Sequence, residues 1–394
     1  MSSAGVAITG IGLLTSNADS AESFTAALRE GKSGVKDITR FETGWSFRQG
    51  GEVELPPEDQ EAKLDRVSQL AVSAARRAVK DSGLSTSALE STRAGLCVGT
   101  SRGPALSLEQ LLRSNDPGEK RALFTEVPFY SIARNVAQRL GLSGPISTVT
   151  MACVSSSLAV GRACDMIRRG HTAIMVAGGA DSLTTLSFSG FSVLRAMTRT
   201  ACRPFDRRRD GMVLGEGAGM LVLEDLDHAR RRGARVYAEI CGWGTAGDAH
   251  HATSPHPQGR GLASAISAAL RQARLSVDEI DHVNLHGTGT AANDPAECQA
   301  IRQVFGPRSE TVPVNSLKPM IGHTLGAAGV LELTGSILGM RGGFVPPTLN
   351  YQEPDPSCNL NVVGGQAREQ RIGVLLSTKS AFGGANVAIV ARRV

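Results

Sequence analysis

The sequence has few aromatic residues and no long apolar run. Phe, Trp and Tyr make up 4% of its 394 residues, so we expect a core packed mainly with aliphatic side chains. No apolar run reaches the ~18 residues of a membrane-spanning helix. The N-terminus also lacks the charged segment and apolar block of a secretory signal. We therefore expect a soluble protein of the cytoplasm.

Cysteine patterning and strong charge are also missing. The seven cysteines are an odd number without a CxxC pair, which argues against a disulfide framework and against a thiolate zinc site. The net charge of +5 is mild and spread along the chain, which argues against a nucleic-acid surface but allows a local basic patch for an acidic partner. Glycine is abundant, with 45 residues, and indicates many tight turns.

Cys153 lies at a predicted turn between a strand and a helix. Residues 146–150 are rich in β-branched side chains and predict a buried strand, while residues 155–170 have the spacing of a helix with small side chains. The first N–H groups of a helix lack internal partners, and its dipole favours a thiolate there. Cys153 is therefore a candidate nucleophile; the alternative is an inert core thiol.

The two halves of the chain echo each other. Residues 146–167 and 312–333 both read as a strand, a turn with a reactive side chain and a helix of small residues. The pattern predicts two related halves, residues 1–235 with the nucleophile and residues 236–394 with two histidines. If a pseudo-twofold axis relates the halves, the two small-residue helices meet at the centre and bring Cys153 and His323 to one pocket.

A thiolate nucleophile needs a stabilising partner and donors for the oxyanion that forms during acyl transfer. His286 and His323 stand among glycines at a strand end and a helix start, although each alone could be a structural turn residue. Lys318 would add positive charge beside them. The turn at Gly383 could offer an oxyanion N–H, with the Phe382 ring as a lid.

Three other motifs do not support a cofactor or metal. The strand at residues 6–14 lacks the third glycine of a dinucleotide-binding turn. Residues 322–329 lack the Lys-Ser/Thr ending of a phosphate loop. His250, His251 and His256 lack a second ligand group with recognisable spacing. We predict neither a cofactor nor a metal.

Five motifs together resemble those of one family. They are MACVSS, RPFDRRRDGMVLGEGAG, HGTGT with NDPAE, NSLKPMIGHTLGAAG and AFGGAN. The chain resembles, over essentially its whole length, the β-ketoacyl-acyl-carrier-protein synthases of the elongating type, in the thiolase superfamily. The resemblance implies an α/β fold with five αβαβα layers in two similar halves, no cofactor, and a homodimer or a heterodimer with a similar chain.

The resemblance also implies a reaction and a role for each matching residue. Cys153 would carry the acyl group, and His286 and His323 would promote the decarboxylation of a malonyl group on an acyl carrier protein. Lys318 would orient the site electrostatically, and Glu332 matches a buried acid of the family. The carbanion would then attack the acyl thioester in a decarboxylative condensation.

The resemblance assigns further roles at the pocket and on the surface. Phe382 matches a gating residue, and its backbone N–H together with that of Cys153 would form the oxyanion hole. Val154, Ser380 and the loop after HGTGT depart from fatty-acid members and favour a specialised polyketide or polyene synthase. The candidate docking residues for an acidic carrier protein are Lys63, Arg66, Arg203, Arg207, Arg208 and Arg209.

Four alternatives remain open at this point. A biosynthetic thiolase would have a second cysteine in its C-terminal glycine motif, and AFGGAN has none. An initiating condensing enzyme would have asparagine in place of His323. A non-catalytic or weakly catalytic chain-length-factor subunit typically lacks the nucleophile, whereas Cys153 is present. A cysteine hydrolase is the fourth alternative.

Overall fold

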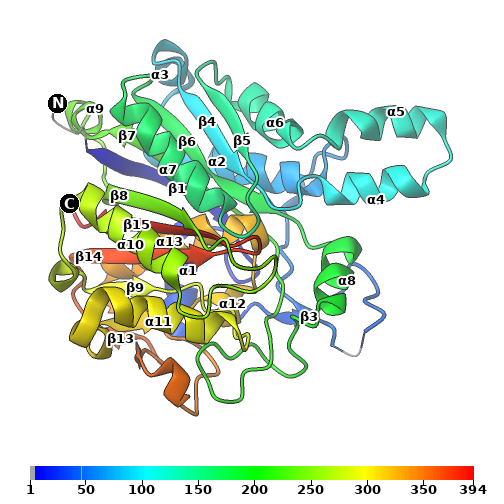
Figure 1. Ribbon diagram of the computed structural model, residues 1–394. Coiled ribbons are helices and arrows are strands. Elements are labelled where there is room, and N and C mark those ends of the chain that lie inside the picture. The colour runs from blue at the N-terminus through cyan, green and yellow to red at the C-terminus, as the bar shows by residue number, and fades with distance from the viewer. Residues whose placement is uncertain (1–4, 46) are drawn as a thin grey trace.

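A central β-sheet organises the chain, and the computed structural model describes residues 5–45 and 47–394 (Figure 1). Within these residues, eleven strands follow the order β12-β10-β9-β14-β15-β8-β1-β7-β6-β4-β5. Their bounds are β1 Val6–Leu14, β4 Gly95–Gly99, β5 Ile146–Val149, β6 Ile174–Asp181, β7 Gly217–Asp225, β8 Ala238–Gly247, β9 His282–Asn284, β10 Pro313–Asn315, β12 Asn361–Val362, β14 Val374–Ser380 and β15 Ala385–Arg392. Short strands pair elsewhere, β2 (Lys36–Asp37) with β3 (Gln49–Gly50) and β11 (Phe344–Val345) with β13 (Arg368–Glu369).

The helices of the described chain vary from one turn to about five turns. They are α1 Ala21–Glu30, α2 Arg66–Ser82, α3 Thr86–Ser91, α4 Ala105–Arg113, α5 Pro117–Glu126, α6 Tyr130–Leu140, α7 Ser155–Arg168, α8 Thr185–Val193, α9 Leu226–Arg231, α10 Arg260–Ala273, α11 Asn293–Phe305, α12 Lys318–Ile321 and α13 Ala328–Gly342. Helix α2 has the expected ends, with an Asp65 side chain that accepts from the Val67 N–H and a left-handed Gly83 after its last turn. No helix in these residues has both the length and the apolar character needed to cross a membrane.

The sheet consists of two halves with the same pairing pattern. From β1 through β7, β6 and β4 to β5, two antiparallel pairings are followed by two parallel ones. From β8 through β15, β14 and β9 to β10, the same order of pairings recurs. The two halves join where residues 6–8 of β1 pair with residues 238–240 of β8. The predicted repeat is therefore present in the topology.

Helices lie outside and between the two halves. Helix α2 packs on β1, β7 and β6, and α10 packs on β8 and β15. Helix α7 contacts β6 and β4 of one half and β15 of the other, while α13 contacts β14 and β7. The main apolar clusters follow this order, one beneath α2, one around α7 and α13, and one beneath α10. The predicted five-layer αβαβα fold is confirmed.

The two central helices pack with their backbones close together because small residues line their contact. A Cβ added to Gly329 of α13 would lie 2.1 Å from Ser157 Oγ of α7. The Val330 N–H donates to Ser156 Oγ at 3.0 Å. Since α7 begins beside Cys153 and α13 follows the loop of His323, this contact brings the two reactive side chains together.

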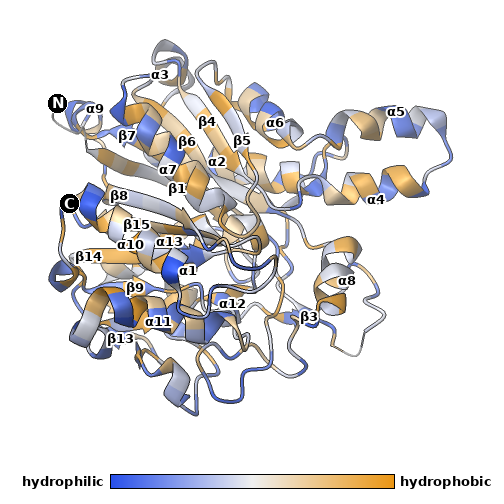
Figure 2. Cartoon of the chain, in the orientation of Figure 1, coloured by the Kyte–Doolittle hydropathy of each residue, from blue (hydrophilic) through white to orange (hydrophobic). Residues whose placement is uncertain are grey.

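One segment projects from the body, and one local prediction was wrong, that of a buried strand at residues 146–150. Residues 106–121 form most of α4 and half of α5, which lie side by side and project from the body (Figure 1). Their apolar residues do not face the chain's own core: Leu112 is 78% and Phe124 71% exposed, and Figure 2 shows apolar stretches along α4. Strand β5, expected to be buried, is an edge strand in which Ile146 is 47% exposed.

Candidate active site

Cys153 follows a strained residue in the turn between β5 and α7. Ala152 has a left-handed φ of 45°, a conformation that costs a residue with a Cβ roughly 1 kcal/mol or more. The Ser155 side chain holds this turn, since its oxygen accepts from the Met151 N–H at 2.8 Å and lies 3.0 Å from the Thr100 carbonyl oxygen. The Cys153 side chain, 5% exposed, lines a small cavity.

The two histidines belong to loops that distant parts of the chain hold in place. His286 follows β9, and the carboxylate of Glu297 on α11 accepts its backbone N–H. His323 lies between α12 and α13. Its N–H donates to the Val213 carbonyl at 2.7 Å, and its own carbonyl accepts from the Gly215 N–H at 3.0 Å. Both histidine side chains are therefore fixed by backbone contacts as well as by burial.

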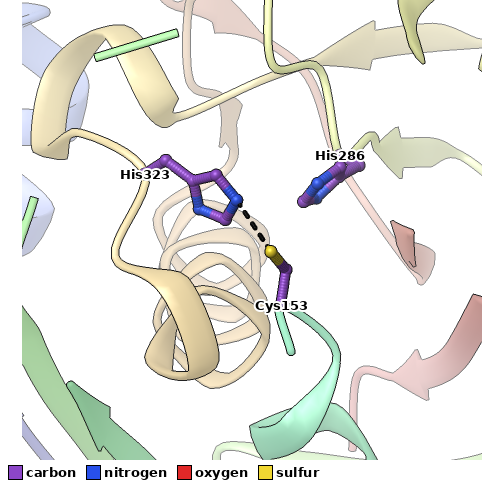
Figure 3. Close-up of side chains that lie close together, drawn as sticks. All are labelled: Cys153, His286 and His323. Atoms are coloured by element: carbon purple, nitrogen blue, oxygen red, sulfur yellow. Dashed lines mark hydrogen bonds between the residues drawn. The ribbon is translucent and has the colours of Figure 1, made fainter. Parts of the chain in front are cut away.

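The structure brings Cys153, His286 and His323 together (Figure 3). His323 Nε2 lies 3.1 Å from Cys153 Sγ. The two imidazole rings meet edge to face, with centroids 5.2 Å apart and an interplanar angle of 83°. The predicted convergence of Cys153 with His323 is thus present, and His286 completes the group from the same half as His323.

The neighbours of the two rings determine which nitrogen carries the proton. Lys318 Nζ lies 3.2 Å from His286 Nδ1, and an ammonium can only donate. The Leu325 N–H points at His323 Nδ1 over 3.3 Å. Both Nδ1 atoms therefore accept, and in a neutral ring the proton then lies on Nε2. Each imidazole directs an N–H donor toward the cavity beside the sulfur.

This protonation pattern does not suit a metal ion, although a thiol and two imidazoles are the kinds of side chain that bind metals. The ligand atoms of Cys153, His286 and His323 lie within 4.8 Å of one another. A metal-bound histidine normally donates its second ring N–H to an acceptor, whereas here both second nitrogens face donors. Of the other candidate histidines, His250 and His256 have ring centroids 5.1 Å apart, with the rings tilted by 59° to each other.

Burial determines the ionisation of the group. It raises the pKa of the Cys153 thiol to about 12, and the charge of Lys318 opposes this shift. Burial, followed by the charge of Lys318, lowers the pKa of both His286 and His323 well below 6.5. The resting site therefore holds a thiol and two neutral imidazoles, not the preformed thiolate that the helix N-terminus led us to expect.

Lys318 and Glu332 lie directly beneath the histidines. Lys318 Nζ forms an ion pair with Glu332 Oε1 at 2.7 Å, and both side chains are 0% exposed. Lys318 also donates to the His286 carbonyl oxygen. The lysine therefore connects the His286 loop to helix α13.

The cavity above the sulfur has a volume of about 50 Å³ and is closed partly by aromatic rings. Phe382 and Phe191 line it, with ring centroids 5.8 Å apart. The Gly383 N–H donates to the Ala252 carbonyl at 2.7 Å, so its prediction as an oxyanion donor was wrong. Among the described residues, the N–H groups of Cys153 and Phe382 donate to no backbone carbonyl, which leaves both available to a substrate oxygen; the Cys153 N–H also lies beside its own sulfur.

Comparison with protein families agrees with this geometry. Residues 3–229 match the N-terminal domain of beta-ketoacyl synthases, and residues 237–352 match the C-terminal domain. The chain belongs to the beta-ketoacyl synthase family. It is an acyltransferase-type condensing enzyme.

Relatives of this synthase come from more than one pathway. The tetracenomycin polyketide synthase ketoacyl synthase alpha subunit of Streptomyces glaucescens is 40% identical, over 98% of this chain and 97% of the relative. The 3-oxoacyl-[acyl-carrier-protein] synthase 2 of Coxiella burnetii is 37% identical, over 99% and 98%. Among solved structures, the ishigamide ketosynthase/chain length factor has a TM-score of 0.93 and 37% identity, and each chain covers 100% of the other.

The predicted docking residues of the synthase have different surroundings. Lys63, Arg207 and Arg208 are exposed and Arg203 is half-buried, and both Arg207 and Arg208 form surface ion pairs with Glu353. The Arg66 side chain is 13% exposed and binds the buried Glu216 at 2.6 Å. Arg209, 8% exposed, binds Asp355. Both guanidinium groups are taken up by internal ion pairs, so the prediction that Arg66 and Arg209 dock a partner does not fit the structure.

Two buried charged residues of the synthase site escaped the sequence analysis. Asp181, at the end of β6, accepts from the backbone N–H groups of Ser101 at 2.8 Å and Gly326 at 2.6 Å. It thereby ties the loop after β4 to the loop after His323, and burial raises the pKa of Asp181 to about 6. Lys379 on β14 is 1% exposed. The sequence could have indicated both residues, because each is a charged residue that ends or interrupts an otherwise apolar strand.

Proposed function

We propose that the chain is an elongating β-ketoacyl-acyl-carrier-protein synthase in which Cys153 carries the growing acyl group. One observation carries this proposal: Cys153 Sγ and the N–H donors of two neutral imidazoles face the same small cavity. The site uses its own side chains and backbone, and the chemistry below requires no cofactor.

In the first step, the acyl group moves from the carrier protein to Cys153. The sulfur attacks the thioester carbonyl, the bond to the carrier sulfur breaks, and the thiol proton of Cys153 leaves with that sulfur. The carbonyl oxygen gains charge during the attack, and the N–H groups of Cys153 and Phe382 are placed to receive it. The His323 N–H, 3.1 Å from Sγ, stabilises the sulfur as its charge develops.

In the second step, a malonyl group on the carrier protein loses carbon dioxide. The electron pair of the broken C–C bond moves onto the α-carbon, and the charge spreads to the thioester oxygen. His286 and His323 direct their Nε2–H donors at this oxygen, and such a pair is worth several kcal/mol in a water-excluded site. The neutral state of both rings suits this role, because a donor is needed here and not a base.

In the third step, the carbanion attacks the acyl carbonyl on Cys153. A C–C bond forms, the C–S bond breaks, and the released sulfur takes up one proton from solvent, because its own proton left with the carrier sulfur in the first step. Water must stay out, because it would hydrolyse the acyl thioester. The rings of Phe382 and Phe191, 5.8 Å apart, cover the cavity and supply this exclusion.

An acyl carrier protein is the proposed partner for both substrates. The exposed cations Lys63, Arg207 and Arg208, together with the half-buried Arg203, suit an acidic surface. The name of the Coxiella burnetii relative includes an acyl carrier protein, which agrees with this partner. The location proposed for the enzyme is the cytoplasm.

A second chain with the same fold is proposed to cover β5 and the α4–α5 pair. Strand β5 leaves one edge unpaired, with Ile146 and Met151 47% and 48% exposed. Leu112 and Phe124 on the projecting helices are more exposed still. The partner would be a copy of this chain or a ketosynthase-like paralogue. The paralogue is proposed because one solved relative is described as a ketosynthase/chain length factor.

The pathway is proposed as chain elongation in specialised polyketide or polyene synthesis, or in fatty-acid synthesis. The relatives include a polyketide ketosynthase subunit and a 3-oxoacyl synthase. A catalytic role is favoured over that of a non-catalytic chain-length factor, because the nucleophile is present and His323 already contacts it.

Mass spectrometry of the protein after incubation with acyl carrier thioesters tests the proposal. Wild type and the control variant Cys164→Ala should gain the acyl mass, since Cys164 is a second buried thiol, located within α7. Cys153→Ala should gain none. A Cys153→Ala protein that still gains the acyl mass would refute the assignment of the nucleophile.

A further inference from the structure

Lys379 is a buried lysine close to the histidines. It lies on β14 and is 1% exposed. Its Nζ is 2.7 Å from Asn284 Oδ1 and 2.7 Å from the Thr378 carbonyl oxygen. Asn284 ends β9, the strand that leads to His286. Because burying an ammonium group costs several kcal/mol, a second lysine at this place calls for an explanation.

Lys379 and Lys318 share one carboxylate. Glu332 Oε1 hydrogen bonds to Lys318 Nζ at 2.7 Å, and Glu332 Oε2 lies 2.8 Å from Lys379 Nζ, outside hydrogen-bond alignment. All three side chains are buried. Burial lowers the pKa of Lys379; the charge of Glu332 opposes this shift and that of Lys318 adds to it. When both lysines are protonated, two ammonium groups against one carboxylate leave one positive charge in excess beneath the imidazoles.

Other titratable groups near Lys379 do not cancel this charge fully. Glu297 faces the backbone N–H groups of His286 and Gly287, and burial raises its pKa to about 7, so it is only partly ionised at neutral pH. Asp294, one turn earlier on α11, is held by backbone N–H groups, and burial raises its pKa as well. Burial lowers the pKa of His282 to about 4, so this ring is neutral.

The excess charge acts on the histidines more than on the cysteine. Lys379 contributes to the lowering of the pKa of both His286 and His323, after burial and Lys318. The largest effects of neighbouring charges on the pKa of Cys153 come from Lys318, Asp181 and Arg102. Lys379 is therefore placed to affect the step that depends on the imidazoles.

We propose that Lys379 is a positioning residue for the condensation, whose ammonium group restores the positive charge that Glu332 takes from Lys318 and keeps both imidazoles as neutral N–H donors. Through Asn284 it also holds the end of β9 that carries His286. The charge favours the anion on the thioester oxygen during decarboxylation. This inference rests on the proposed function.

The proposal is tested by measuring two half-reactions, acyl transfer to Cys153 and release of carbon dioxide, in the variants Lys379→Met and Lys379→Gln. In both variants the release of carbon dioxide from malonyl carrier protein should fall by about tenfold to a hundredfold, somewhat less than the loss of a direct donor. Acyl transfer to Cys153 should stay within about threefold of wild type. Equal losses in both half-reactions, or undiminished release of carbon dioxide, would overturn the proposal.

A double variant separates the charge from the packing of the side chain. Lys379→Met alone leaves Lys318 balanced by Glu332, with no excess charge. Adding Glu332→Gln removes the carboxylate, so that Lys318 again supplies one excess positive charge, as in wild type. Release of carbon dioxide should therefore recover relative to Lys379→Met alone, whereas a purely structural role predicts a further loss. Histidine nitrogen NMR gives an independent readout, in which Lys379→Met should raise the pKa of both imidazoles; unchanged titration would contradict the charge role.

The wild-type enzyme distinguishes the two levels of inference. If wild type releases no carbon dioxide from malonyl carrier protein, the proposed function fails. If wild type releases it and both Lys379 variants release it equally fast, only the role of Lys379 fails.

Discussion

The buried charges beneath the histidines make Glu332→Gln the most informative stability variant. Glu332 is the carboxylate that contacts both Lys318 and Lys379, at 2.7 Å and 2.8 Å. Its removal leaves two buried ammonium groups with neutral partners, chiefly His286 for Lys318 and Asn284 for Lys379. Breaking a buried ion pair in this way costs about 3–5 kcal/mol.

The expected change in melting temperature follows from the length of the chain. An unfolding entropy of about 2.1 cal/mol/K per residue gives roughly 0.8 kcal/mol/K for 394 residues. A loss of 3–5 kcal/mol therefore lowers the midpoint by about 4–6 °C. Calorimetry at a fixed protein concentration measures this shift without interference from assembly.

A surface pair supplies the matched control. Glu353 binds Arg207 at 2.7 Å, with side chains 37% and 67% exposed, so Glu353→Gln should cost less than about 1 kcal/mol. The double variant Glu332→Gln with Lys379→Met should be more stable than Glu332→Gln alone, because it no longer buries the Lys379 ammonium group without a carboxylate. If Glu332→Gln destabilises the protein no more than Glu353→Gln, the reasoning about buried charge is wrong.

Three further predictions concern ionisation, packing and assembly. Burial raises the pKa of Glu297 from 4.5 to about 7; the folded state then keeps a proton that the unfolded chain releases, so its contribution to stability falls by up to ~3 kcal/mol as pH rises through this range. Urea unfolding of wild type against Glu297→Gln at several pH values checks this, and parallel curves would contradict it. Gly329→Ala places a Cβ 2.1 Å from Ser157 Oγ and should cost about 1–3 kcal/mol in chemical denaturation, whereas Gly118→Ala, with its nearest neighbour at 3.4 Å, should cost nothing measurable. Phe124→Asp should shift the sedimentation coefficient of the assembly toward that of a single chain, because Phe124 is 71% exposed on the α4–α5 pair, which is proposed to contact the partner chain. An unchanged coefficient would count against that interface.

Local patterns, and the likeness between two segments, were enough to predict much of the fold. The strand at residues 6–14 is continuous and apolar and coincides with β1. The matching order of residues 146–167 and 312–333 predicted that α7 and α13 pair, and hence that Cys153 meets His323. Both inferences depend on local spacing and on the repeat.

The errors arose where a distant residue determines the outcome. Gly383 donates to Ala252, and Arg66 binds Glu216, and neither partner could be predicted from the motifs themselves. The two ammonium groups around Glu332 come from β14 and α12, so their shared carboxylate becomes visible only when the sheet is assembled. The burial that raises the pKa of Cys153 to about 12 is likewise a property of the assembled layers and not of the turn alone.

The central claim is that the sulfur accepts the acyl group with only assistance from His323, whereas the loss of carbon dioxide requires both imidazoles. The most direct test measures both half-reactions in His286→Ala and His323→Ala. Protein mass reports acyl transfer, and labelled carbon dioxide from malonyl carrier protein reports decarboxylation. We predict that both variants gain the acyl mass on Cys153 while release of carbon dioxide falls by about 10²–10³. Release at the wild-type rate in either variant would contradict the account.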